Sequence, residues 1–254
     1  MSSINDLKIY FGDDYVINNA ITIKHPTIGD IVDLNEQDYF STVYTLAAIP
    51  SDMKSQLWDL GICWEDISDF ELFAMLSRSL TVDRTKVFFG DLDFTRFELM
   101  KNSINDELVM VQQVDPSEDN PDGLIVIDTY IYLQIVTFIR KLHNIKPVVE
   151  KAGSKIVRQI LIEEDRRKIA KVKGEEYRSQ LLPMVSSLIN CSEFKYGLKE
   201  VRQMPIYAFM DSLARIQIVK SSTALLQGCY SGMIDTSKID KKELNWMRPM
   251  DKEA

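Results

Sequence analysis

The fold is decided by residues 124–143, which read LIVIDTYIYLQIVTFIRKLH. The first four of them are large and aliphatic, three being β-branched, and they predict a short strand. Asp128 then occupies the position of a helix cap, and the apolar residues after it recur at helical spacing as far as His143. A strand that leads directly into a capped helix indicates a fold containing both sheet and helix.

The part of the chain before this stretch predicts several more strands. Residues 107–114 are expected to form one, separated from 124–127 by the exposed acidic loop DPSEDNPDG at 115–123. Residues 87–94 are also predicted to be extended. At the start of the chain we expect a small β meander, with strands at residues 7–11, 15–17 and 21–24.

Helices are predicted on both sides of the deciding stretch. The clearest begins at Ser68-Asp69-Phe70-Glu71, a capping box that predicts a helix from 69 to about 80, with Ile67 and Leu72 placed as a hydrophobic staple. Pro26 and the apolar spacing after it predict helix up to Ala48. The other predicted helices are 51–60, 129–143, a solvated helix or helix pair within 151–178, 181–189 and 206–226.

These elements together predict an α+β protein that is mainly helical. A small N-terminal β meander and a few central strands precede a helical C-terminal half. We expect an acidic α+β half at residues 1–114, a loop or hinge at 115–123, and a mainly helical basic half at 124–254, packed into one unit.

Charge is divided sharply along the chain. Of the 254 residues, those at 1–128 carry 8 basic and 24 acidic side chains, whereas those at 129–254 carry 22 basic and 14 acidic ones. The net charges of the two parts are therefore −16 and +8. Such a chain can pair its own halves, stack head to tail with copies of itself, or offer different faces to basic and acidic partners.

Several classes of protein are excluded by composition and pattern. The densest apolar stretch, residues 130–139, is interrupted by Gln134 and is shorter than the roughly 18 residues that a membrane span needs. The first residues lack the pattern of a secretory signal, so we expect the protein in the cytoplasm of the cell that makes it. Three widely spaced cysteines predict neither a disulfide framework nor a zinc site, but reduced and mostly buried thiols.

No catalytic constellation is recognisable. The two histidines lie outside motifs: we interpret His25 as a turn residue and His143 as a cation facing the C-terminal dipole of its helix. Asp91 and Asp93 make only a carboxylate doublet, which a solvated strand face explains. Glycine-rich phosphate loops are absent from the sequence. We therefore expect no catalytic residue, no metal, no cofactor and no enzymatic activity.

A basic segment raises the alternative of nucleic-acid binding. Residues 140–178 carry 12 basic against 6 acidic side chains. Because Glu163, Glu164 and Asp165 precede the arginines and no aromatic residue lies between 140 and 176, an ion-paired helix surface is the better interpretation. The same residues could contact an acidic protein surface, including the first half of this chain. The candidate basic surface comprises Arg158, Arg166, Arg167, Lys168 and Lys171.

Several short segments of the sequence resemble proteins of tailed phages that infect Gram-positive hosts. They are HPTIGDI at 25–31, DFELF at 69–73, FFGDL at 88–92, LIEED at 161–165 and LNWM at 244–247. The proteins that carry these segments look like products of the morphogenesis region of long-tailed phages or prophages. More loosely, FMDSL at 209–213 and LLQG at 225–228 resemble the helical ends of tail assembly chaperones, although this chain is longer than many of them.

The resemblance implies a non-enzymatic tail assembly chaperone, which would bind tape-measure and tail-tube proteins in the host cytoplasm. We place the candidate partner surface at Phe209, Met210, Trp246 and Met247. Large apolar residues more often lie in the core, so each of these also has a purely structural interpretation. Two alternatives stay open: a structural subunit of the tail or baseplate that self-associates through its opposite charges, and a nucleic-acid-binding accessory protein.

Overall fold

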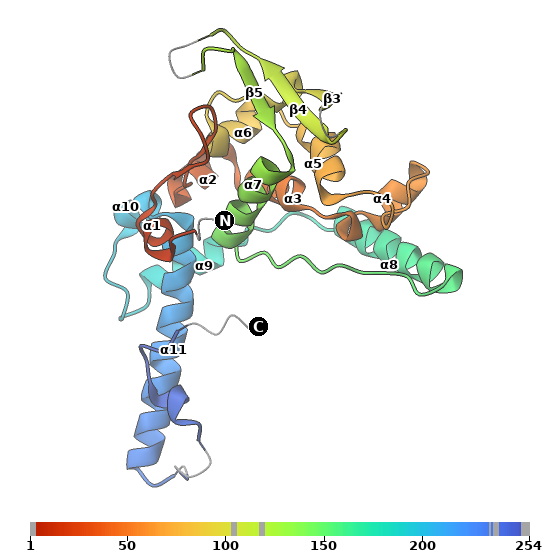
Figure 1. The fold of residues 1–254 in the computed structure, drawn as a ribbon. Helices are drawn as coiled ribbons and strands as arrows, with labels where there is room; N and C mark the ends of the chain where they lie inside the picture. The colour runs from red at the N-terminus through yellow and green to blue at the C-terminus, as the bar shows by residue number, and fades with distance from the viewer. Residues whose placement is uncertain (1–3, 103–105, 117–119, 234, 236–238, 250–254) are drawn as a thin grey trace.

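A computed structural model describes residues 4–102, 106–116, 120–233, 235 and 239–249 (Figure 1). The first part of the chain forms α1 (Asp6–Phe11), β1 (Tyr15–Val16), β2 (Thr22–Ile23), α2 (Ile28–Leu34), α3 (Glu36–Ala47), α4 (Lys54–Asp59), α5 (Asp69–Ser77) and α6 (Val82–Phe89). There follow β3 (Glu98–Lys101), β4 (Leu108–Gln113), β5 (Leu124–Ile127), α7 (Thr129–Leu142), α8 (Lys155–Lys173), α9 (Leu181–Ile189), α10 (Leu198–Gln203) and α11 (Ile206–Tyr230). The prediction of a mainly helical α+β fold is confirmed.

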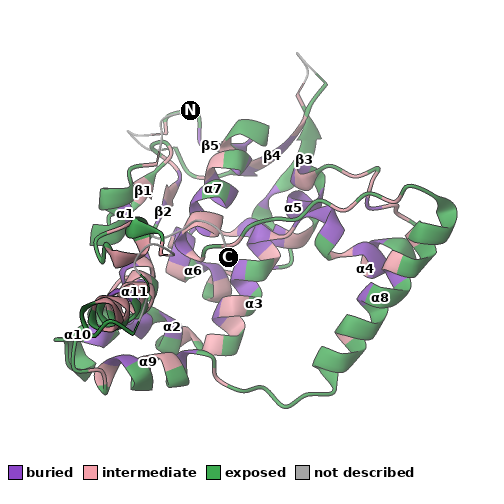
Figure 2. Ribbon diagram, turned by 90° about the horizontal axis from the view of Figure 1, so that it is seen from below, coloured by how far each residue is buried: buried purple, intermediate pink, exposed green. Residues whose placement is uncertain are grey.

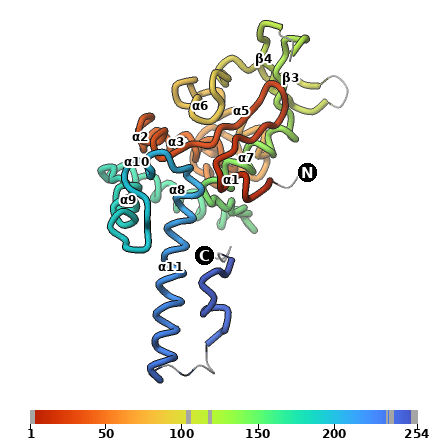
Figure 3. Tube along the Cα trace, turned by 90° about the vertical axis from the view of Figure 1, so that its left-hand side faces the viewer, coloured from red at the N-terminus to blue at the C-terminus, as the bar shows by residue number. Residues whose placement is uncertain are grey.

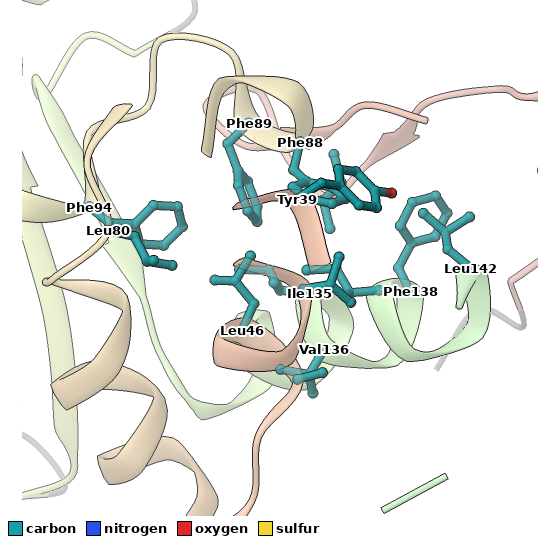
Figure 4. Close-up of a cluster of buried hydrophobic side chains, with 14 of the residues drawn as sticks. Tyr39, Leu46, Leu80, Phe88, Phe89, Phe94, Ile135, Val136, Phe138 and Leu142 are labelled. Carbon is teal, nitrogen blue, oxygen red and sulfur yellow. The ribbon is translucent and has the colours of Figure 1, made fainter. Parts of the chain in front are cut away.

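The main core lies where α3, α6 and α7 meet the inner face of a three-stranded sheet (Figure 4). Asp128 caps α7 by accepting a hydrogen bond from the Ile131 amide at 2.8 Å. The helix then buries Ile135 and Phe138 completely. The Tyr39 ring of α3 stacks on Phe88 of α6, with ring centroids 5.3 Å apart. Because β5 leads directly into α7, residues 124–142 hold sheet and helices together.

The sheet has the antiparallel order β3-β4-β5. The predicted loop at 115–123 therefore connects two neighbouring strands, although its residues 117–119 lie outside the described part of the chain. Buried residues from before and after this loop share the main core. The predicted division of the chain at 115–123 stays a prediction.

Two predicted strands are helices in the structure. Residues 7–11 belong to α1, because Asn5 caps the Leu7 amide and Gly12 ends the helix with a φ of 81°. Residues 87–89 close α6, which ends at Gly90 with a φ of 62°. Both segments are short and rich in large apolar residues, so strand and helix cannot be told apart by period alone.

The helix predicted from Pro26 to Ala48 is divided in two. Asn35 has a φ of 84° and ends α2, while its side chain accepts a hydrogen bond from the Gln37 amide and so caps α3. The capping box at Ser68 and the helix after it are confirmed. A single residue, Asn35, thus separates two helices that the apolar periodicity predicted as one continuous helix.

The C-terminal helices dock on the N-terminal ones through backbone and side-chain contacts. The Ile28 amide donates to the Met204 carbonyl at 3.0 Å, and the Ile206 amide donates to the Pro26 carbonyl at 2.9 Å. On α3, the Glu36 carboxylate accepts from the amides of Gln180 and Leu181 at the start of α9. Burial raises the pKa of Glu36, but the hydrogen bonds around it outweigh burial and lower the pKa overall.

Replacing Gly29 with alanine is expected to destabilise this docking by about 1–3 kcal/mol. A Cβ atom at Gly29 would lie 2.8 Å from the Arg202 carbonyl oxygen, so α10 would have to shift away from α2. Chemical denaturation measures the loss. Gly153→Ala is the matched control, since a Cβ there meets nothing within 4 Å. Equal stability of the two variants would contradict the close approach.

Two helices project from the core. α11 runs away from the sheet and forms an arm, along which residues 240–248 return (Figures 1 and 3). α8 lies on the other side of the molecule and packs on α4 (Figure 2). Among the described residues, no helix is long and apolar enough to cross a membrane.

Candidate partner-binding surfaces

The arm is a helix with a polar seam along one side. Ser222 of α11 is buried, and its hydroxyl donates to the Glu243 carbonyl at 2.8 Å. The Arg215 guanidinium donates to the carbonyls of Trp246 and Arg248, at 3.1 and 2.8 Å. These bonds fix the returning segment against α11, so the arm presents side chains from both.

The predicted partner residues separate into two groups. Phe209 is completely buried in the main core, so it holds the base of α11 and is not available at the surface. Met210, Trp246 and Met247 are exposed, the last at 68%. Their role in partner binding stays a prediction.

The most exposed large apolar side chains of the described residues are ones that the sequence interpretation missed. Tyr230 ends α11 and is 87% exposed, and Met233 follows it at 86%. Between them, Gly232 turns the chain with a φ of 71°. The sequence contains one weak indication of this site, namely two large apolar residues on either side of the glycine that follows a long helix. The arm therefore carries apolar groups at its tip as well as along its side.

Asp211 and Arg215 lie one helical turn apart on α11. Arg215 directs its hydrogen bonds to the two carbonyls of the returning segment. Burial raises the pKa of Asp211, and the charge of Arg215 offsets this only in part. Arg215 thus stabilises the arm by holding the returning segment against α11.

The candidate basic surface lies on α8, where two of its five members are in ion pairs with the first half. Arg158 contacts Glu65 at 2.6 Å and lies over the Trp64 ring, and Arg166 contacts Asp59 at 2.5 Å. The expected pairing with the chain's own acidic half is present. Arg167, Lys168 and Lys171 are exposed.

A buried carboxylate attaches α8 to α4. Asp165 accepts hydrogen bonds from the Ser55 amide at 2.9 Å and the Ser55 hydroxyl at 2.6 Å. Ser55 lies in the first turn of α4, where unpaired amides and the helix dipole favour a negative charge. Asp165 therefore caps α4 from a distant part of the chain, which sequence spacing cannot reveal.

Asp165→Ala is expected to cost about 2 kcal/mol, because the Ser55 amide loses a charged acceptor in a buried place. The loss should be local. Hydrogen exchange should show weaker protection in α4 and α8, with α7 unchanged. Arg167→Ala on the same helix is the control and should leave protection as it is. Unchanged α8 protection in the Asp165 variant would contradict the capping role.

His143 differs from its predicted role, whereas His25 lies in the connection between β2 and α2. His143 is a half-buried neutral side chain: its Nδ1 lies 2.8 Å from the Ile139 carbonyl and its Nε2 lies 2.7 Å from the Tyr39 hydroxyl. Because a carbonyl only accepts, Nδ1 carries the proton and Nε2 accepts from Tyr39. Burial lowers the pKa of His143 to about 4, so the prediction of a cation facing the helix dipole is wrong. His25 is buried, and burial lowers its pKa as well.

The remaining candidate groups lie apart from one another. Asp93 caps the short 3₁₀ helix Phe94–Arg96 by accepting from the amide and hydroxyl of Thr95. All three cysteines are free and half-buried, where burial was expected. In the described part of the chain, no group of three or more His, Cys, Asp or Glu residues could hold a metal ion.

Comparison with known proteins matches part of the chain. Residues 173–251 fit the model of a family described as the YomV second domain. That is a phage-derived name of the Bacillus prophage type, consistent with a phage protein. The matched residues include α9, α10, α11 and the returning segment, hence the whole arm. Neither a curated protein nor a solved structure matches this chain.

Proposed function

We propose that this chain is a phage tail morphogenesis protein, and that it acts as a non-enzymatic tail assembly chaperone. Its partners would be the tape-measure and tail-tube proteins of the same phage. The proposal combines the family match of residues 173–251 with the resemblance of several short sequence segments to phage morphogenesis proteins.

The observation that supports this function best is the apolar surface of the arm. Tyr230 and Met233 project from its tip, and Trp246 and Met247 from its side. Large apolar and aromatic side chains with this exposure are typical anchors of protein interfaces. A helix that is already formed before binding reduces the conformational entropy lost when these side chains are buried.

The paired substitution Tyr230→Asp with Met233→Asp is expected to weaken binding to the tape-measure protein at least about 100-fold. Each anchor contributes about 1.5–3 kcal/mol when buried, and about 1.4 kcal/mol corresponds to tenfold in affinity. Co-expression of the two proteins followed by quantitative co-purification measures the loss.

Leu198→Asp is the matched control for the arm variant. It places one aspartate, half the charge of the arm variant, at an apolar site of α10 that is 68% exposed. It should leave co-purification unchanged. Normal binding by the arm variant, with unchanged folding, would refute this placement of the surface.

A second candidate is a structural subunit of the virion tail or baseplate. The opposite net charges of residues 1–128 and 129–254 favour it, because they suit head-to-tail stacking. Mass spectrometry of purified virions beside the infected lysate separates the two functions. A chaperone is abundant in the lysate and absent from particles, whereas a subunit has a fixed ratio to the tail-tube protein.

A further inference from the structure

The outer face of the three-stranded sheet is mostly apolar, with Glu98 and Gln113 as its polar members. Strand register places Glu98, Val111 and Val126 side by side in one row across the sheet. Because side chains alternate between faces, Met100 and Leu124 share this face with them. Met100 is 51% exposed, Leu124 45% and Val126 39%, whereas Val109 on the same face is buried. The opposite face carries Met110, Ile125 and Ile127, which belong to the main core.

Acidic side chains lie on this face and at one end of it. Glu98 lies on it, at the end of its row. Asp115 and Asp122 lie where the β4 and β5 connection begins and ends, and both are exposed. Residues 96–128 carry eight acidic and two basic side chains in the sequence. A partner that covers the sheet must therefore offer apolar groups beside positive charge.

The outward face of α8 offers that combination. Ile156 and Ile160 lie one turn apart on it and are 71% and 51% exposed. At helical spacing, Arg167 and Lys171 continue the same stripe toward the C-terminus, and both are exposed. Between the two parts the exposed Glu163 and Glu164 flank the stripe, and Glu163 is paired with Arg166. The opposite side of α8 is occupied by Ile162 and Asp165, which contact the α4 region. The stripe is thus apolar at its N-terminal end and basic at its C-terminal end, with one acidic neighbour, Glu164, that has no ion-pair partner among the described residues.

We infer that the outer face of the sheet binds the outward face of α8 from a second copy of this chain. A sheet with one uncovered apolar face is completed by a helix layer, which is the common arrangement in α/β packing. Ile156 and Ile160 would contact Met100, Leu124 and Val126. Arg167 and Lys171 would then meet the acidic residues beside the sheet.

The dimensions of the two surfaces agree. The stripe from Ile156 to Lys171 is about 22 Å long at 1.5 Å per residue. β4 has six residues and spans about 20 Å, and the three strands are together about 10 Å wide between outer axes. An area of this size falls in the class of weak, reversible interfaces. Because the sheet and α8 lie on different sides of one molecule, the contact is head to tail and leaves one surface free at each end (Figure 1).

Sedimentation velocity of the full chain tests this contact, over about 5–500 µM and at about 50 and 500 mM salt. The mean sedimentation coefficient should rise with concentration at low salt, and the association constant should fall at least about tenfold at high salt. Val126→Asp on the sheet and Ile160→Asp on α8 should each abolish association. Leu182→Asp, at a site of α9 that is 68% exposed, should associate like the wild type.

Mixing the two variants gives the decisive result. Val126→Asp keeps an intact α8 and Ile160→Asp keeps an intact sheet, so the mixture should form a 1:1 dimer that grows no further. The charge reversal Arg167→Glu with Lys171→Glu repeats the α8 test at exposed sites, with unchanged thermal unfolding as the check on folding.

A wild type that stays monomeric throughout would overturn the inference. So would wild-type association by either aspartate variant, or a mixture that remains monomeric. The arm substitutions at Tyr230 and Met233 should leave self-association as it is. Failure here is therefore distinguishable from failure of the proposed chaperone function.

Discussion

Phe138→Ala should lower the free energy of unfolding by about 3–5 kcal/mol, the range for truncating a buried phenylalanine. Phe138 is 1% exposed at the centre of α7. Its ring stacks on Tyr15 with centroids 5.0 Å apart and contacts the edge of His25. Tyr15 also donates to the Gln134 side chain one turn earlier in α7. The truncation would therefore loosen the N-terminal hairpin as well as create a cavity.

Urea denaturation of Phe138→Ala measures this loss directly. Tyr130→Ala is the matched control, since it also removes an aromatic ring from α7, at a site that is 54% exposed. Its expected effect is below about 1 kcal/mol. Comparable losses in the two variants would show that α7 does not form the central layer of the core.

Acid should destabilise the protein through His143, by about 3 kcal/mol at pH 4 and below relative to neutral pH. The folded-state pKa is about 4, because burial penalises the charged ring, whereas the unfolded value is 6.5. The unfolded state therefore binds the proton first. The stabilisation is complete above pH 6.5 and is lost progressively as the pH falls from 6.5 to 4.

His143→Gln separates this contribution from that of the carboxylates, which titrate in both proteins. The variant should show a shallower fall of unfolding free energy between pH 6.5 and 4, with the missing slope approaching about 1.4 kcal/mol per pH unit. His25, whose pKa burial also lowers, remains in both proteins and cancels in the comparison. Parallel curves would refute a neutral His143 with a lowered pKa.

The sequence predicted correctly two helices whose first residues include a side chain that caps the backbone. The hydroxyl of Ser68 and the carboxylates of Glu71 and Asp128 specify helix starts whatever the tertiary context, and both helices form where expected. The segments at 7–11 and 87–94 carry no such interior signal: Asn5 caps the first helix from outside the segment, and Thr81 before α6 makes no capping hydrogen bond within the described part of the chain. Packing, not propensity, decided those segments.

The candidate binding surfaces were harder to predict from the sequence than the fold was. Phe209 and Met210 are neighbours on one helix, yet one is buried and the other exposed, because their side chains point to different sides of α11 and only that of Phe209 meets the main core. Arg158 and Arg166 pair with Glu65 and Asp59, contacts that span more than ninety positions. Spacing within a helix cannot show which side a distant segment covers.

The pairing of residues 26–28 with residues 204–206 affects how the protein is made. These partners are separated by roughly 180 residues, which a ribosome adds in about 10–35 s at the usual rates of synthesis. During that interval α2 has emerged without the segment that covers it. Productive folding on the ribosome then depends on the N-terminal helices staying free of wrong contacts until α10 and α11 arrive, and early termination would release chains with that surface uncovered.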